Sequence, residues 1–220
     1  MAKQKYSRKL VLLVILSWLI IFCAFSYEAI LVGAGKFLAP AGMGSADVVI
    51  VEGEELIREK AVKISAELLS SGRASRMVVV LQENPKDEKF FAFPDYVPLL
   101  IKDLQALKLQ GKQFMVIRVP TNHPITLTEA RIVLADLSVH GVRSAILVAE
   151  GFHTRRSLWS YKQAGLTLGI EIIPFPCFTR YQGDGWWRKP EGLKEFFEES
   201  TKLLYYLLRG YIPIKSLVVT

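Results

Sequence analysis

The chain has 220 residues, enough for one domain of ordinary size and an additional segment. Its formal net charge is +7, but four basic residues lie in the first nine positions, and subtracting those four leaves +3 for the rest of the chain. No dense basic stripe interleaved with aromatic residues is present, so nucleic-acid binding is not expected.

The chain opens with the pattern of a membrane anchor. Residues 1–9 are a basic tail, and residues 10–32 are apolar or small with few exceptions, a length that crosses about 30 Å of hydrocarbon as a helix. Basic residues before such a span keep the N-terminus in the cytoplasm, so we expect a single-pass protein of the cytoplasmic (inner) membrane. A cleaved signal peptide is the alternative, because small residues in 33–41 suit a peptidase, but its apolar core is usually only about 7–15 residues long. In both cases residues 46–220 form a domain in the periplasm or outside the cell.

Residues 33–45, rich in Gly, Ala and Pro, are predicted to be a linker that holds this domain away from the bilayer. Apolar strands and amphipathic helices then alternate, a pattern typical of a three-layer α/β domain with a parallel sheet. The strands are expected at 47–51, 77–81, 114–119, 145–149 and 170–174, and the helices at about 54–70, 96–109, 127–139 and 154–165.

The C-terminal part differs from this alternation. Residues 181–188 are rich in Gly and Trp and predict a loop, and residues 190–209 predict a long amphipathic helix. Its apolar run is too short to cross a membrane, so we expect it to pack on the domain as a last helix. The alternative is a helix lying in the membrane interface beside Trp186 and Trp187. The residues expected on its apolar face are Leu193, Phe196, Phe197, Leu203, Leu204, Leu207 and Leu208.

Polar residues follow several of the predicted strands. Parallel sheets bind ligands at the carboxyl ends of their strands, so these residues form a candidate site. They are Glu52 and Gly53, Gln82 and Glu83, residues 121–123, and residues 150–153.

The most unusual pattern is the pair Arg155 and Arg156 in the first turn of a helix expected to begin after an N-cap at Thr154. The helix macrodipole already presents positive potential there, so two cations are unfavourable unless an anion compensates them. The pattern therefore predicts a pocket for a phosphate or carboxylate. The alternative is that both arginines are solvated or paired with Glu129 or Glu150.

Acid–base chemistry at this pocket would fall to His153 and the carboxylates near it. A carboxylate at a strand end can hold the imidazole in one tautomer and raise its pKa, as a general base requires. The candidate acid or base groups are His153, Glu52, Glu129 and Glu150, and the candidate anion binders are Arg58, Arg131, Arg155 and Arg156. Ser157, which follows the arginines, is expected to be a hydroxyl on the helix surface.

Motifs for a bound cofactor, a metal or a serine nucleophile are absent from the sequence. There is no G-x-S-x-G elbow, no Walker loop and no Gly-rich dinucleotide fingerprint after a strand, so we expect no cofactor. His123, His140 and His153 are too scattered to predict a zinc site. Cys23 lies in the predicted anchor and Cys177 in the domain, so no disulfide within the chain is expected.

The segment AILVAEGFHTRRSLWSYKQAGL, with its strand, Phe-His-x-x-Arg turn and helix, resembles the hallmark of the bacterial envelope family of unknown function that includes the SanA, ElyC and YdcF proteins. The resemblance covers most of residues 46–210 and includes ADVVIVEG, AELLSSGRASRMVVV, TLTEA and KLLYYLLRGY. It implies a Rossmann-like domain behind a single membrane anchor, and a role in cell envelope or peptidoglycan biogenesis with no settled reaction.

The resemblance also implies which residues form the site. Two departures from the family pattern, Gly53-Glu54 after the first strand and Leu81-Gln82-Glu83 after the second, remove glycine where a ligand would approach and predict a degenerate or retuned site. Residues carried over from the family pattern are Glu52, Gly53, Arg58, Thr126, Glu129, His153 and Arg156.

Three hypotheses of function follow. In the first, the outer domain binds, and hydrolyses or transfers, an anionic small molecule or lipid-linked sugar phosphate. His153 would then be the acid or base, Glu52 and Glu129 its partners, and Arg155 with Arg156 the anion clamp. In the second, a non-catalytic envelope assembly factor uses the same pocket for docking. The third, nucleotide or S-adenosylmethionine binding, suits the fold but not an external compartment.

Overall fold

The computed structural model of the chain describes residues 2–53, 59–83, 97–107, 109 and 113–213. Its centre is a sheet of five strands, built from short runs of β-branched and other apolar residues that are buried almost completely in β1. All pairings are parallel, in the order β3-β2-β1-β4-β5. The strands are β1 (Val48–Val51), β2 (Arg76–Glu83), β3 (Phe114–Pro120), β4 (Ser144–Glu150) and β5 (Glu171–Cys177).

Helices follow the strands as the sequence predicts. The helix expected at 154–165 is confirmed at both ends, and the predicted start of the first domain helix at 54–58 lies outside the described residues. The helices are α1 (Ala2–Leu38), α2 (Glu59–Ser70), α3 (Val97–Ala106), α4 (Ile125–Val139), α5 (Thr154–Gly165) and α6 (Pro190–Leu208), with short 3₁₀ turns η2 (Gly151–His153) and η3 (Trp186–Arg188).

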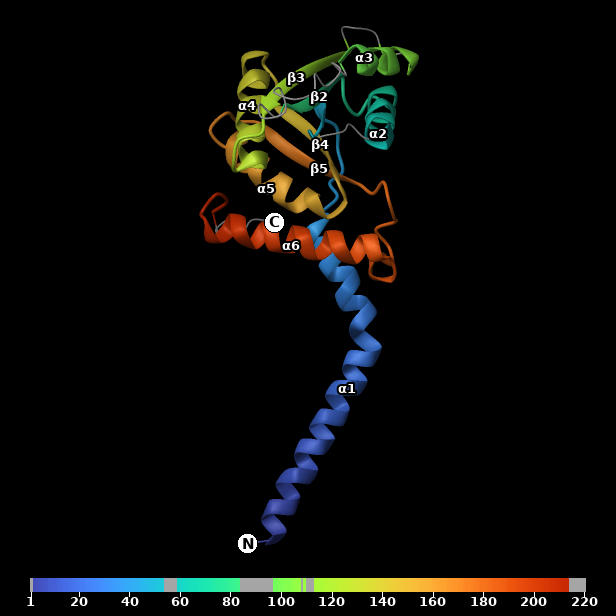
Figure 1. Ribbon diagram of the computed structural model, residues 1–220, viewed down its shortest axis with the longest axis vertical. Coiled ribbons are helices and arrows are strands. Elements are labelled where there is room, and N and C mark those ends of the chain that lie inside the picture. Colours follow the sequence, from blue (N-terminus) through green and yellow to red (C-terminus); the bar gives the residue numbers. More distant parts are fainter. Residues whose placement is uncertain (1, 54–58, 84–96, 108, 110–112, 214–220) are drawn as a thin grey trace, which may run out of the picture.

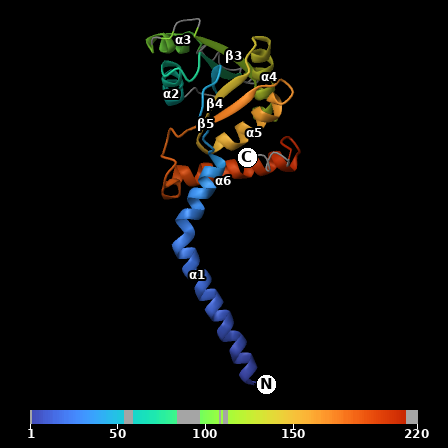
Figure 2. The same cartoon turned by 180° about the vertical axis from the view of Figure 1, so that it is seen from behind.

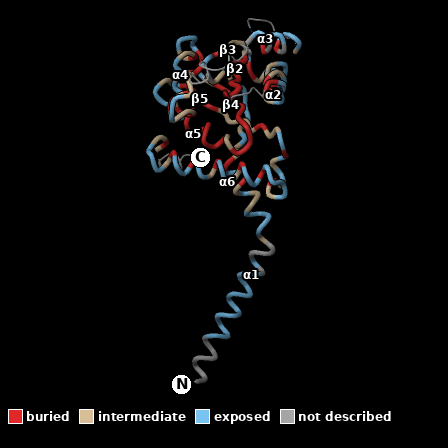
Figure 3. Tube along the Cα trace, in the orientation of Figure 1, coloured by how far each residue is buried: buried red, intermediate tan, exposed pale blue. Residues whose placement is uncertain are grey.

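Two apolar layers enclose the sheet and confirm a Rossmann-like α/β domain (Figures 1 and 2). Helices α4 and α5 cover one face, where Ile50 and Leu147 point. Helices α2 and α3 cover the other, where Val49 and Ile146 point. Alternate residues of one strand therefore enter opposite layers, and the buried segments of Figure 3 lie mainly between these helices.

The strand order reverses at β1, because the chain leaves β1 toward β2 and later returns to β4 on its other side. Open α/β sheets bind ligands in the crevice at this switch point, beyond the carboxyl ends of the two strands. In this chain the crevice is bounded by Glu52 and Gly53 after β1 and by η2 after β4. The topology thus places two polar segments, about 100 residues apart in sequence, beside each other.

Helix α1 contains the whole of the predicted anchor and continues as far as Leu38, so the predicted linker at 33–45 is helical over its first part. The rest of that segment contacts the domain, since the backbone N–H of Gly42 donates to the carbonyl of Pro174 at 2.8 Å. Within the part of the chain that the structure describes, no helix is both long and apolar enough to cross a membrane. The anchor therefore stays a prediction.

Helix α6 lies across one end of the domain, between α5 and the long projecting part of α1 (Figures 1 and 2). Its orientation differs from the sequence expectation. Leu203 is buried as predicted, but Phe197 and Leu208 are exposed, and two acidic residues, Glu195 and Glu199, are buried in their place. The inward face of α6 is therefore partly ionic, because this face covers a charged site.

Candidate functional site

The turn after β4 brings a histidine and a helix start to the end of the sheet. Gly151 has a φ of +33°, and a Cβ at this position would lie 2.3 Å from the Oε1 atom of Glu195, so glycine is required there. The N-cap of α5 is His153, so the prediction that Thr154 is the N-cap is wrong. The hydroxyl of Thr154 is buried and donates instead to the carbonyl of Gly151 at 2.7 Å.

A pocket of about 760 Å³ opens at this end of the sheet. The turn after β4, the start of α4 and one flank of α6 form its walls, and most of the lining residues are charged or polar. They include Gly53, Gln82, His123, Thr126, Glu150, His153, Arg156, Arg180, Glu195, Glu198, Glu199, Lys202, Tyr205 and Tyr206.

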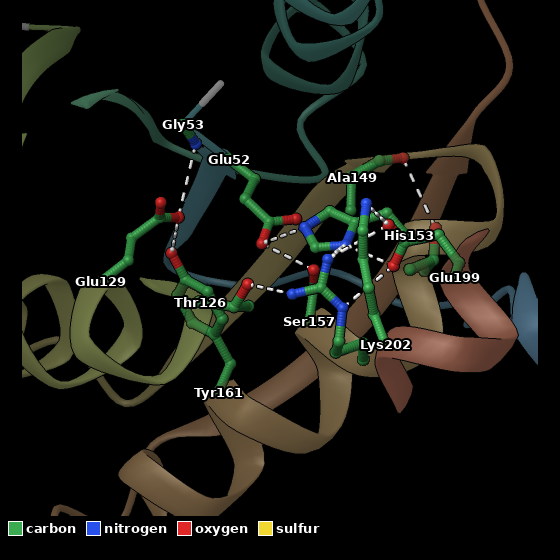
Figure 4. Close-up of polar contacts among 12 residues, drawn as sticks. Glu52, Gly53, Thr126, Glu129, Ala149, His153, Ser157, Tyr161, Glu199 and Lys202 are labelled. Atoms are coloured by element: carbon green, nitrogen blue, oxygen red, sulfur yellow. Dashed lines mark hydrogen bonds and ion pairs between the residues drawn. The ribbon is translucent and has the colours of Figure 1, made fainter. Parts of the chain in front are cut away.

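His153 lies between two carboxylates (Figure 4). Its Nε2 atom is 3.0 Å from Oε1 of Glu52, and its Nδ1 atom is 3.2 Å from Oε2 of Glu199. Burial alone would lower the pKa of His153, but the two negative carboxylates outweigh burial and the nearby Arg156 charge and raise this pKa to about 10. The ring is therefore protonated at neutral pH, and both of its N–H groups donate to carboxylates.

Arg156 is the second cation of the site. Its Nε atom donates to Oε2 of Glu199 at 2.9 Å, and its Nη1 atom donates to the hydroxyl of Thr126 at 2.5 Å. The Nη2 atom lies 2.8 Å from Nδ1 of His153 and 3.2 Å from Oε1 of Glu199. Only a neutral imidazole could accept from Nη2. Because the flanking carboxylates favour the imidazolium, Nη2 donates to Glu199.

Glu199 is the carboxylate that compensates these cations. Besides His153 and Arg156, it accepts a bond from Nζ of Lys202 at 2.8 Å, and its side chain is only 7% exposed. Burial acts to raise the pKa of Glu199, but the charges and hydrogen bonds of His153 and Arg156 lower it strongly. Glu199 is therefore ionised throughout the neutral range and holds three cationic side chains in place.

Glu52 has one engaged oxygen and one free oxygen. Its Oε1 atom accepts from His153 and, at 2.6 Å, from the hydroxyl of Ser157. Its Oε2 atom is buried and has no hydrogen-bond partner among the described residues. A buried carboxylate oxygen without a partner is rare and often marks a place where a ligand or solvent binds. Ser157 is fully buried, so the expected surface hydroxyl is instead part of the site.

Glu129 lies behind this layer and joins the ends of β1 and β2. Its Oε1 atom accepts from the backbone N–H of Gly53 at 3.3 Å and from the hydroxyl of Tyr161 at 2.9 Å, and its Oε2 atom accepts from Gln82 at 2.8 Å. Burial first, and then the negative charge of Glu52, raise the pKa of Glu129 to about 7 against these hydrogen bonds. Glu129 therefore changes its protonation near neutral pH.

Not every residue selected from the sequence reaches the pocket. Arg155 points toward α1, where its Nε atom donates to the carbonyl of Phe37 at 2.5 Å and its guanidinium lies over the rings of Phe37 and Trp159. Neighbouring helical positions face directions about 100° apart, so only one of the two arginines can face the site. Arg58 lies outside the described residues. Gly53, Thr126, His153 and Arg156 line the pocket, and Glu52 and Glu129 are hydrogen-bonded to His153 and Gly53 in the same cluster.

Sequence reasoning missed Glu199, Lys202 and Tyr161, and it named Gln82 as a polar residue at a strand end and as a loss of glycine, without a partner. The amide of Gln82 in fact bonds both Glu129 and the carbonyl of Gly53. One signal for Glu199 was present in the sequence, because Glu195 and Glu199 are four residues apart and lie on one face of a helix whose other residues are largely apolar.

The site offers an imidazolium, a guanidinium and a carboxylate with a free oxygen, a set that can bind an anionic group and move a proton. Among the residues that the structure describes, no group of three His, Cys, Asp or Glu side chains is arranged to hold a metal ion. The sequence matches no model of a known protein family and no curated protein sequence.

Proposed function

We propose that the chain is a membrane-anchored envelope protein whose α/β domain binds an anionic substrate, phosphorylated or lipid-linked, and hydrolyses or transfers its charged group. The resemblance to the family that includes SanA, ElyC and YdcF supports the compartment. His153, Arg156 and Thr126 line one pocket at the switch point of the sheet, and Glu52 is hydrogen-bonded to His153; this convergence supports the chemistry.

The roles follow from protonation and hydrogen bonding. The unpaired Oε2 atom of Glu52 is the acceptor for the proton of an attacking water or hydroxyl. The oxygen of the attacking water or hydroxyl forms a bond to the phosphorus or acyl centre as the bond to the leaving oxygen breaks. The imidazolium of His153 supplies the leaving oxygen with a proton. Arg156 and Thr126 hold the anionic group, and preorganised charges of this kind are a large source of transition-state stabilisation.

The anchor is supported by the surface of α1. Large apolar side chains are exposed on every side of the helix between Leu10 and Phe22, with exposed fractions of 49–69%. A helix that is apolar all round requires an apolar environment around it. Together with the basic residues before it, this surface favours a span with the N-terminus in the cytoplasm.

Ligand binding is tested by thermal unfolding of the full chain in detergent with sugar phosphates and with prenyl phosphates. A ligand at 100 times its Kd stabilises by about 2.7 kcal/mol, which raises Tm by a few degrees. We expect the shift to be lost in Arg156→Lys and kept in Arg155→Lys, because only Arg156 faces the pocket. Release of phosphate or lipid is then measured for every ligand that binds. Equal shifts in the two variants, or none with any anion, would contradict the proposal.

Docking without catalysis is the second candidate. It is favoured by Glu199, which already neutralises Arg156 and Lys202 and leaves less cationic charge for a ligand. An assay of turnover distinguishes catalysis from docking. A docking site binds its ligand without converting it, and Glu52→Gln does not affect this binding.

A further inference from the structure

Helix α6 has three distinct faces. The residues at Gly192, Glu195, Glu199, Leu203 and Tyr206 are buried against the domain. A second face carries the pocket-lining residues Glu198, Lys202 and Tyr205. The third face is apolar and exposed to solvent, and it consists of Leu193, Phe197, Leu204 and Leu208, with exposed fractions of 39%, 66%, 56% and 77%.

This outer stripe, Leu193–Phe197–Leu204–Leu208, follows one side of the helix. Its members are four, seven and four residues apart, so they lie along one side of the helix over most of its length of about 28 Å. A solvent-exposed helix face normally carries charged residues, and here the acids Glu195 and Glu199 point inward while the four residues of the stripe point outward. The stripe therefore needs an apolar partner outside the domain.

The position of α6 relative to α1 identifies that partner. The turn before α6 is fixed to α1, because Trp186 Nε1 donates to the carbonyl of Leu31 at 3.2 Å and Arg188 pairs with Glu28 at 2.6 Å. From there the apolar part of α1 runs away from the sheet, and α6 lies crosswise between the two (Figures 1 and 2). The outer stripe thus lies on the side of the domain from which the exposed apolar surface of α1 leaves.

We propose that α6 lies on the outer surface of the membrane, with this stripe immersed in the lipid interface. Amphipathic helices bind in this way, parallel to the bilayer, with their apolar face at the boundary of head groups and acyl chains. Exposed charges at the flanks fit an anionic lipid surface, since three basic residues outnumber two acidic ones once Arg188 and Lys202, which are paired with Glu28 and Glu199, are left out. The basic residues are Lys189, Lys194 and Arg209, and the acidic ones are Glu191 and Glu198.

This inference rests on the anchor in the proposed function and narrows its substrate class. One helix supplies both the immersed stripe and a wall of the pocket, so the pocket opens at the level of the lipid head groups. A lipid-linked anion therefore reaches Arg156 while its chain stays in the bilayer. A soluble phosphate would reach the same residue only from the aqueous side.

The test is nitroxide labelling of the full chain reconstituted in vesicles of phosphatidylcholine and phosphatidylglycerol. Single cysteines are introduced as Phe197→Cys on the stripe, Lys194→Cys on the charged flank and Leu16→Cys in the anchor, all in a Cys23→Ser background. Cys177 is buried and does not need replacement. Collisions with oxygen, which concentrates in lipid, are compared with collisions with a water-soluble nickel chelate.

We expect the oxygen-to-nickel collision ratio at Phe197→Cys to exceed that at Lys194→Cys several-fold, and the ratio at Leu16→Cys to be higher still. A high ratio in the anchor with equal low ratios on α6 would overturn membrane docking and leave the anchor standing. A low ratio at Leu16→Cys would overturn both the anchor and the membrane docking of α6. If the Phe197 label is shielded from both reagents and shows spin–spin broadening, a second copy of the chain covers the stripe, which also overturns the inference.

Discussion

At the scale of single residues, the site is a balanced set of buried charges. Glu52 and Glu199 are the anions that contact His153, and Arg156 is held by the same Glu199. Charges taken out of water are tolerated only while their partners remain, since removing one partner leaves the other uncompensated. Neutralising a single member of the cluster should therefore lower the free energy of unfolding.

Glu199→Gln is the most informative of these changes. We expect it to lower the free energy of unfolding by about 3–5 kcal/mol, because it leaves His153 and Arg156 with one carboxylate fewer in a buried site. The matched control is Glu198→Gln on the same helix. That side chain is 49% exposed and 3.7 Å from Lys194, so its loss should change stability by less than about 1 kcal/mol. Both values come from urea unfolding of the full chain in detergent, followed by tryptophan fluorescence. Equal losses in the two variants would refute a charge-balanced cluster.

Glu129 gives the fold a pH dependence with a defined sign. Its pKa rises from 4.5 to about 7 on folding, so the folded state binds the proton more tightly than the unfolded state. This proton contributes about 3 kcal/mol to the free energy of unfolding. The contribution is complete below pH 4.5 and is lost as the pH rises through 7. His153 has the same sign over a later range, from about 6.5 to about 10.

The measurement is unfolding free energy between pH 4.5 and 7 for the wild-type chain and Glu129→Gln. The difference between the two curves should fall across this range, because glutamine does not titrate. A constant difference would mean that Glu129 has an ordinary pKa in the folded chain. Comparing the variants also removes the contribution of Glu199, whose lowered pKa changes stability only at more acidic pH.

Much of this site could be predicted from the sequence, and the part that could not has a physical reason. Glu52, Gly53 and His153 directly follow buried strands, so strand order alone brings them together. Glu199 is 46 residues from His153 and belongs to a helix that packs from outside the alternating pattern. The four-residue spacing of Glu195 and Glu199 places both acids on one face of that helix, but it does not indicate that this face turns inward.

At the scale of elements, strands and helices were predictable because each type has its own pattern of apolar residues along the sequence. The strand at Val48–Val51 is apolar throughout, as expected for a strand covered on both faces, and α5 begins and ends where its pattern does. The register of α6 was not predictable, because its apolar residues outnumber those that one face can bury. The neighbours of α6, the charged site and α1, decide which of them turn inward.

The placement of α6 depends on a glycine at its start. A Cβ on Gly192 would lie 2.3 Å from the carbonyl oxygen of Trp186, which is backbone and has little freedom to move. We expect Gly192→Ala to destabilise the fold by about 1–3 kcal/mol, as overpacked sites do, and to weaken ligand binding by displacing Glu199. Gly33→Ala is the control, since no atom lies within 4 Å of its Cβ and alanine favours a helix. Thermal unfolding with and without ligand measures both effects. If Gly192→Ala matched the control, α6 would not depend on this contact.

At the scale of the whole molecule, the domain and the long helix form one arrangement. Arg155 lies over Phe37, and Trp186 bonds to Leu31, so α1 meets the domain through its last turns. The part from Leu10 to Phe22 exposes large apolar side chains with no partner among the described residues. With α1 as the anchor that we propose, these contacts would hold the pocket at a fixed height relative to the bilayer. The sequence predicted both parts but not this attachment, because the predicted linker gave no sign of being helical.

The anchor is tested by placing charge in it. Leu16→Arg with Ile20→Arg should make insertion less favourable by about 6–8 kcal/mol, since arginine near the centre of a span is strongly opposed and leucine or isoleucine is favoured. The chain should then be extracted from membranes by alkaline carbonate, whereas the wild-type chain should resist extraction. Val139→Arg with Leu166→Arg adds the same charge at exposed apolar positions of the domain, with exposed fractions of 84% and 75%, and should leave extraction unchanged. If the first pair also resisted extraction, α1 would not span the membrane, and its apolar surface would require a protein partner.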